Sequence, residues 1–115
     1  MRLLNVFAAL SGLIALVMLV LAAHALQPAL EDLQRIQLGA FIQLGAAAAG
    51  LALANRSGRL NLIAGAMILI GAAIFAGTLY TLVITHSRAL VMLAPIGGIT
   101  LILGWFALLF TKPNA

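Results

Sequence analysis

The feature that most limits the fold is the placement of the charges, which occur only in short clusters between four long apolar runs. The charged residues are Arg2, Glu31, Asp32, Arg35, Arg56, Arg59, Arg88 and Lys112. A charge at the centre of a membrane helix costs roughly 2.5–3.5 kcal/mol, so this segregation is expected where the bilayer is the solvent. Only 7% of the residues are charged and 65% are apolar, whereas soluble domains have about 25% and 45–50%. The sequence therefore predicts an integral membrane protein.

Each apolar run has the length of a membrane-spanning helix, which needs about 20 residues. The runs cover about residues 3–23, 36–54, 60–85 and 90–110. Because the links between them are short, we expect consecutive helices to be antiparallel. The predicted fold is an all-α membrane protein, with residues 1–115 forming one four-transmembrane-helix up-down bundle.

The first apolar run has a second interpretation, as a signal peptide. Arg2 supplies a basic start, and Ala23-His24-Ala25 resembles a cleavage site. The run is about 20 residues long, however, and the apolar part of a signal peptide typically has about 7–15. We therefore favour a first transmembrane helix that is retained.

The basic residues of the short loops predict the orientation, because such residues stay on the cytoplasmic side. With four spans, both termini and the middle loop share one side. That side carries Arg2, Arg56, Arg59 and Lys112. The opposite side carries two basic residues together with both acids. The distribution predicts a multi-pass protein with both termini in the cytoplasm.

The first outer loop has helical spacing of its own. Leucines and an isoleucine recur between residues 26 and 36, Glu31 and Arg35 are one turn apart, and Pro28 suits a first helical turn. We predict a short interfacial helix with its leucines toward the acyl chains. The alternative is that this segment continues the second transmembrane helix.

Small residues repeat at a spacing of four on every span and predict close helix packing. The rows are Ala8 and Gly12; Ala46, Gly50 and Ala54; Ala73, Gly77 and Thr81; and Thr100 and Gly104. Gln43 is the most polar side chain that we expect inside the bundle, and its amide needs a partner there. A hydrogen bond to another helix is favoured over a contact with a substrate.

Pro95 is followed by Ile96, Gly97 and Gly98, and together they form the clearest irregularity in the chain. Proline removes a backbone donor and clashes with the preceding turn, while glycine adds backbone freedom. We predict a kink in the outer half of the fourth helix. A packing kink is favoured over a substrate-binding break of the kind found in transporters, because no charged side chain lies beside it.

Three sequence blocks resemble a known family. They are Phe7-Ala8-Ala9-Leu10-Ser11-Gly12 with Ala22-Ala23-His24, Phe75-Ala76-Gly77-Thr78-Leu79-Tyr80, and Ala94-Pro95-Ile96-Gly97-Gly98 with Gly104-Trp105. In order and spacing they resemble the YgdD-like family of small bacterial inner-membrane proteins, a domain of unknown function (number four-two-three). The resemblance implies four transmembrane helices in the bacterial inner (plasma) membrane and brings no catalytic residue. Members often have a tyrosine and a histidine in the second span, where this sequence has Ile42 and Ala46.

His24 and His86 are the two side chains in or near the spans that titrate near neutral pH. In the predicted topology they end the first and third helices on the same side. A metal or haem held by both is one interpretation, but two histidines without a carboxylate or cysteine make an incomplete metal site. We favour a capping role for each at a helix end and predict no cofactor and no metal site.

The predicted spans contain no Asp or Glu. General acid–base catalysis and proton-coupled export therefore lack a buried carboxylate, and we predict that the protein is not an enzyme. Scattered basic residues form no patch for nucleic acid, so the expected partners are membrane lipids, a second copy or another membrane protein.

The predicted function is that of a compact accessory or structural module in the membrane, of unknown biochemical role. Tyr80 near the outer interface and Trp105 near the inner one are expected to be aromatic anchors. The alternative is a small transporter or channel for a neutral or lipidic molecule, without proton coupling through a buried carboxylate.

Overall fold

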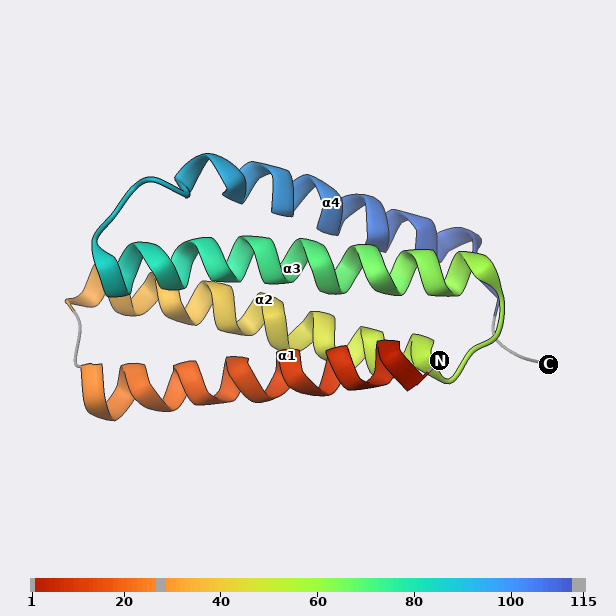
Figure 1. Cartoon of the computed structure of the whole chain (residues 1–115), viewed down its shortest axis with the longest axis horizontal. Coiled ribbons are helices and arrows are strands. Elements are labelled where there is room, and N and C mark those ends of the chain that lie inside the picture. Colours follow the sequence, from red (N-terminus) through yellow and green to blue (C-terminus); the bar gives the residue numbers. More distant parts are fainter. Residues whose placement is uncertain (1, 27–28, 113–115) are drawn as a thin grey trace.

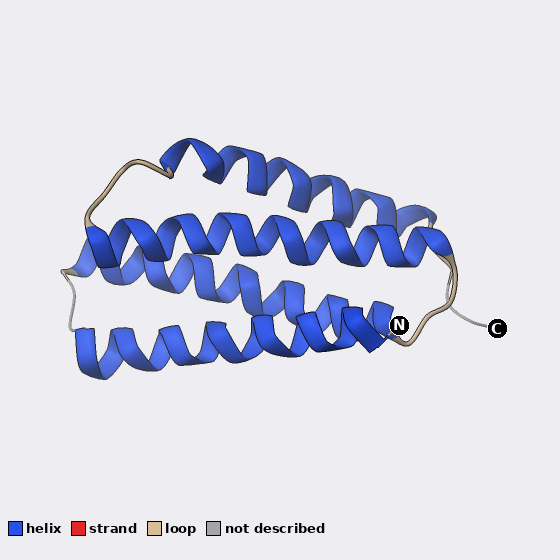
Figure 2. Ribbon diagram, in the orientation of Figure 1, coloured by secondary structure: helices blue, strands red, loops and turns tan. Residues whose placement is uncertain are grey.

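The computed structural model describes residues 2–26 and 29–112, and four long helices account for most of them (Figure 1). They are α1 (Arg2–Leu21), α2 (Leu30–Ala54), α3 (Arg59–Thr85) and α4 (Ala94–Ala107). A π-helical turn, η1 (Ala22–Leu26), follows α1, and the 3₁₀ turns η2 (Val91–Leu93) and η3 (Leu108–Phe110) flank α4. All four helical segments are long and apolar enough to cross a membrane. Within the described ranges there is no strand (Figure 2), so the predicted all-α class is confirmed.

Successive helices run in opposite directions along the long axis (Figure 1). The start of α1, the α2–α3 loop and the described end of the chain at Lys112 therefore lie together, at what we call the amino-terminal end. The α3–α4 loop and the start of α2 lie at the opposite end. This arrangement confirms the predicted up-down order of four helices.

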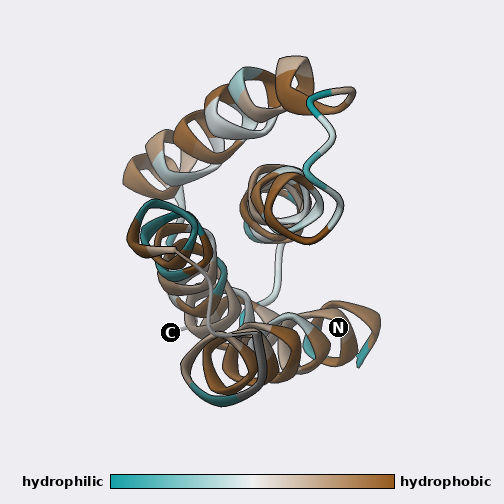
Figure 3. Ribbon diagram, turned by 90° about the vertical axis from the view of Figure 1, so that its left-hand side faces the viewer, coloured by the Kyte–Doolittle hydropathy of each residue, from teal (hydrophilic) through white to brown (hydrophobic). Residues whose placement is uncertain are grey.

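The bundle is an open row of helices. Each helix packs mainly on the next one in the sequence, while α1 and α3 contact each other less extensively. Viewed along the long axis, α1 and α4 lie on opposite sides of the α2–α3 pair (Figure 3). As a result α4 rests almost entirely on α3, and only Gly97 and Gly104 of α4 are buried.

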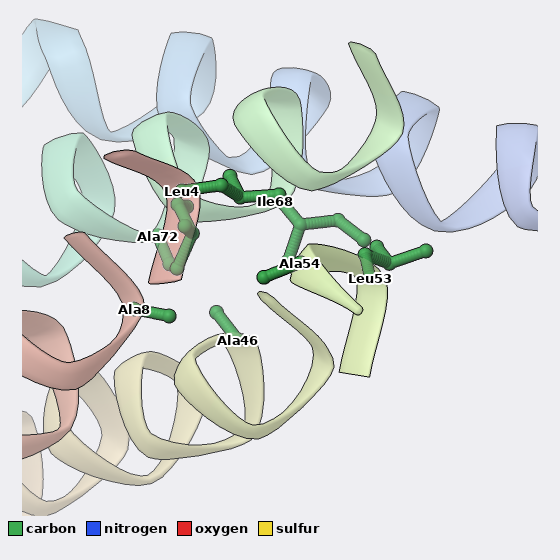
Figure 4. Close-up of a cluster of buried hydrophobic side chains, with 8 residues drawn as sticks. Leu4, Ala8, Ala46, Leu53, Ala54, Ile68 and Ala72 are labelled. Carbon is green, nitrogen blue, oxygen red and sulfur yellow. The ribbon is translucent and has the colours of Figure 1, made fainter. Parts of the chain in front are cut away.

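The interior of the row consists of two apolar clusters rich in alanine. The cluster nearer the amino-terminal end, drawn in Figure 4, contains Leu4, Ala8, Ala46, Leu53, Ala54, Ile68, Leu69 and Ala72. The other contains Ala15, Met18, Ala22, Ile36, Ala40, Ala76, Tyr80 and Val83. Small side chains let the helix backbones approach, which matters in lipid because apolar burial gives little net attraction between helices.

The predicted interfacial helix is not present, because residues 30–36 form the first turns of α2. Leu33 packs against a core cluster and Ile36 is fully buried, so these side chains face the bundle rather than the acyl chains. A helix of 25 residues is about 37 Å long and exceeds the roughly 30 Å of hydrocarbon. Its charged first turns can therefore project into the headgroup region without a separate helix. Pro28 lies outside the described residues.

The small-residue rows predicted on the first two spans form the contact between α1 and α2. A Cβ on Gly12 would lie 3.4 Å from the Cβ of Ala47, and one on Gly50 would lie 3.1 Å from the Cβ of Ala8. The row predicted on the third span is wrong, because Ala73 is exposed and a Cβ on Gly77 would meet nothing within 4 Å.

The contact between α3 and α4 instead depends on glycines that bring the two backbones together. A Cβ on Gly71 would lie 2.6 Å from the backbone N of Leu101, and one on Gly97 would lie 2.7 Å from that of Phe75. A Cβ on Gly104 would lie 2.8 Å from Cγ1 of Ile68. The row that α4 uses is therefore Gly97 and Gly104, two turns apart, rather than Thr100 and Gly104.

Pro95 does not kink α4 from within, which corrects the prediction. It lies in the first turn of the helix, directly after the 3₁₀ turn η2. The first turn has backbone N–H groups that lack a partner in any helix, so the missing proline N–H costs nothing there. Pro95 thus marks the start of α4, and the glycine after Ile96 serves packing against α3.

Candidate functional site

The most polar contact inside the bundle joins Gln43 of α2 to Tyr80 of α3. The Tyr80 hydroxyl donates a hydrogen bond to Oε1 of Gln43 across 2.8 Å. The two residues are 4% and 8% exposed. An unpaired amide or hydroxyl in hydrocarbon would cost several kcal/mol, so each group satisfies the other. This is the interhelical bond predicted for Gln43. It also corrects the expected role of Tyr80, whose hydroxyl faces the interior rather than the headgroups.

The ring of Tyr80 packs against Gly39, which has no side chain, between α2 and α3. A Cβ at Gly39 would lie 3.4 Å from Cε1 of Tyr80 and 3.3 Å from Cα of Ala76. Gly39 was not among the residues predicted from the sequence. Its spacing of four from Gln43 places both on one face of α2, and that spacing is the signal that would have indicated a shared contact.

The two histidines occupy exposed positions at the end opposite the amino terminus. His86 ends α3 in a left-handed conformation with φ of 57°, and its backbone N–H bonds to the carbonyl of Leu82 at 2.9 Å. His24 lies inside η1 and is the last residue of the first helical segment that is long and apolar enough to cross a membrane, Arg2–His24, as expected. Across residues 2–26 and 29–112, no three His, Asp or Glu side chains gather as ligands for a metal ion.

Both acids bind the same arginine at this opposite end. Arg35 contacts Oε1 of Glu31 at 2.7 Å and Oδ1 of Asp32 at 3.0 Å, all within the first turns of α2. The i, i+4 pair predicted between Glu31 and Arg35 is therefore formed. The consequence is an unequal distribution of charge. The two acids offset the charges of Arg35 and Arg88 at this end, whereas the amino-terminal end carries four basic residues and neither acid.

Asn61 joins three segments at the amino-terminal end. Its Nδ2 donates to the carbonyl of Ser57 at 2.8 Å and to that of Lys112 at 3.3 Å. The residue is buried, and its Oδ1 has no hydrogen-bond partner in the part of the chain that the structure describes. Asn61 was not among the residues predicted from the sequence, because a residue so close to Arg59 suggests a helix end in water. The side chain instead holds the segment after α4 against the start of α3.

The remaining candidates lie on or next to α4 and form no common site with the buried pair. Gly97 is buried against α3, whereas a Cβ on Gly98 would meet nothing within 4 Å. Trp105 is 47% exposed near the end of α4, and Pro95 is exposed at its start. Of the eight predicted residues, the structure brings together Gln43 and Tyr80. Of the others, His86 and Pro95 lie at helix ends and Gly97 lies in a helix contact.

Comparisons with known proteins agree with a small membrane protein. Residues 20–98 match the family described as "Protein of unknown function (DUF423)". A UPF0382 membrane protein of Haemophilus influenzae is 36% identical over 110 residues, covering 89% of this chain and 86% of its own length. The UPF0382 inner membrane protein YgdD of Escherichia coli K12 is 28% identical over 114 residues, covering 94% and 87%. No solved structure gives a significant match.

Proposed function

The chain belongs to the DUF423 family of membrane proteins, and we propose that it works as a non-enzymatic accessory module of the bacterial inner membrane. Its action would consist of contacts with lipids and with other membrane proteins. The resemblance to inner membrane relatives over most of the chain supports this location.

The observation that carries the proposal is the structural use of the polar side chains. Gln43 bonds to Tyr80, and the hydroxyl of Thr78 donates to the carbonyl of Ile74 at 2.7 Å. Glu31 and Asp32 bind Arg35 at one end of α2. General acid–base catalysis requires a titratable group held ready beside a substrate. The Gln43–Tyr80 bond joins two helices, and the other bonds lie within one helix, so these groups are already engaged in structural contacts, which supports a role in contact rather than chemistry.

Chemical crosslinking in native membranes tests this proposal. We expect wild-type protein to give a reproducible crosslink to a defined membrane protein, and Tyr80→Phe to give the same crosslink because the buried pair is structural. A wild-type protein that yields no crosslinked protein partner, or a Tyr80→Phe variant that folds but loses the partner, would count against the accessory role.

We further propose that both termini lie in the cytoplasm. Basic residues of short loops favour the cytoplasmic side, and four lie at the amino-terminal end against two at the other. Of the two basic residues at that other end, Arg35 is paired with Glu31 and Asp32.

The absence of cysteine from the chain makes the orientation simple to measure. Ser57 lies in the α2–α3 loop and Ser87 in the α3–α4 loop, and both are exposed. In intact spheroplasts, a membrane-impermeant maleimide is expected to label Ser87→Cys and to label Ser57→Cys only after lysis. The reverse pattern would show the opposite orientation.

A further inference from the structure

An apolar groove with a volume of about 390 Å³ lies between α1 and α3. Leu3, Phe7 and Ser11 line it from α1, and Leu62, Ala66 and Ala73 line it from α3. The groove exists because α1 and α3 both pack on α2 and contact each other less extensively. On α3 the lining residues extend from Leu62 to Ile74, which is about 18 Å of helix. One leaflet contributes roughly 15 Å of hydrocarbon, so the groove has the depth of a single leaflet.

The mouth of the groove lies beside two arginines. Arg2 is the first residue of α1 and Arg59 is the first of α3, and these parallel helices start at the same end (Figure 1). The two starts lie close together, because Leu4 packs against Gly65, where a Cβ would lie 2.8 Å from Cδ2 of Leu4. Both arginines are exposed, and the ion pairs of the described residues all involve Arg35 at the far end. The amino-terminal end therefore offers uncompensated positive charge where headgroups would lie.

We infer that this groove binds an anionic glycerophospholipid, with one acyl chain between α1 and α3 and the phosphate beside Arg2 and Arg59. The inference rests on the proposed function, since it names one lipid class among the contacts of the module. The walls are apolar apart from the small hydroxyl of Ser11, which suits an acyl chain. The volume is too small for a helix, whose diameter with side chains is about 10–12 Å.

Charge complementarity selects the headgroup. Basic residues near an anionic leaflet each contribute to binding, and the positive ends of two helix dipoles add to the same field. A zwitterionic headgroup has no net charge, so this positive field attracts it less than an anionic headgroup. Both acids of the chain, Glu31 and Asp32, lie at the opposite end of the molecule, in the first turn of α2.

The headgroup test compares lipids with identical acyl chains. Purified full-length protein in detergent is mixed with phosphatidylglycerol or phosphatidylcholine, and bound lipid is measured by native mass spectrometry. We expect wild type to retain phosphatidylglycerol preferentially. Arg2→Gln and Arg59→Gln should each weaken that retention about fivefold, whereas Arg88→Gln, at the other end, should leave it unchanged. Equal retention of both lipids by wild type, or an equal loss in Arg88→Gln, would overturn the inference.

The test of the acyl chain uses variants whose larger side chains fill the groove. Ala66→Leu combined with Ala73→Leu adds bulk to two lining positions, and Ala73 is exposed, so the folded bundle should tolerate the change. The matched control is Ala48→Leu with Ala52→Leu, on the exposed face of α2. We expect the groove variant, with unchanged helical circular dichroism, to retain at least fivefold less phosphatidylglycerol than the control variant. Equal retention by both would overturn the inference.

A competition experiment with soluble glycerol phosphate tests whether the headgroup binds without an acyl chain. We expect no displacement of bound phosphatidylglycerol, because the acyl chain holds the lipid in the groove. Displacement would show an anion site without a chain and would overturn the inference. Protein crosslinks in native membranes would persist in that case, so the failure of the lipid site is distinguishable from failure of the accessory role.

Discussion

The attachment of α4 differs in kind from the packing within the α1–α2–α3 unit. Between α1, α2 and α3, alanine and leucine side chains from two clusters fill the interior. Between α3 and α4, the backbones themselves meet at Gly71 and Gly97. Leucine and other long side chains can adjust by rotamer changes, but a backbone contact has no comparable freedom. The comparison therefore predicts that α4 tolerates far fewer substitutions at its interface than the other three helices do at theirs.

The largest effect is expected from Gly97→Ala or Gly71→Ala. Either Cβ would fall within 2.8 Å of backbone atoms, so the helices must separate, at a cost of about 1–3 kcal/mol or more. Trp105, the single tryptophan, lies on α4 and reports this separation. Its quenching by brominated phospholipid should rise in both variants.

The control for the glycine substitutions comes from the same two helices. A Cβ on Gly77 or Gly98 would meet no atom within 4 Å. Gly77→Ala and Gly98→Ala should therefore leave Trp105 quenching unchanged. If these variants separate α4 as strongly as Gly97→Ala does, the backbone-contact explanation is wrong.

An intermediate effect is expected from Tyr80→Phe, which removes the hydrogen bond between α2 and α3. Interhelical hydrogen bonds in membranes contribute about 0.6 kcal/mol on average and up to about 1.7. The loss should appear in the free energy of unfolding in mixed micelles, while Trp105 quenching stays as in wild type.

A double-mutant cycle sharpens this result. Gln43→Leu should destabilise the protein to a similar extent, and the double variant with Tyr80→Phe should cost less than the sum of the two. Strict additivity would mean that the two side chains do not interact.

The smallest effect is expected from Gly12→Ala in the contact between α1 and α2. The added Cβ would lie 3.4 Å from the Cβ of Ala47, which is an ordinary contact. We expect a change in the free energy of unfolding within about 0.5 kcal/mol. A loss as large as that of Gly97→Ala would remove the distinction between the two regions.

The predicted spans agree closely with the helical segments of membrane-spanning length, because the bilayer imposes a length that composition reveals. The exception is the start of α2, at Leu30 rather than about residue 36. Charged residues end an apolar run but do not end a helix, so the start of the apolar run did not give the start of the helix. The predicted kink at Pro95 was wrong for a related reason. A proline is tolerated in a first helical turn and disruptive in an interior one, and the apolar run extended across both.

For the candidate residues, the sequence predicted which side chains need a partner but not which residues supply it. Gln43 was expected to need a partner, because an amide in hydrocarbon is costly wherever it lies. Tyr80 was not identified as that partner, since an aromatic residue near a helix end is equally consistent with the interface. Asn61 and Gly39 were missed because their importance depends on segments far away in the sequence that pack beside them.

The sequence by itself determined that the chain crosses the membrane four times and that its charges lie at the two ends, because lipid excludes ions and demands about 20 apolar residues for each crossing. Only the tertiary structure decided which faces of these helices meet. In water, a polar face identifies the exposed side of a helix, but in lipid both sides can be apolar. The backbone contact at Gly71 and Gly97, the inward direction of Tyr80 and the groove beside Arg2 and Arg59 all depend on shape complementarity between helices, which hydropathy does not record.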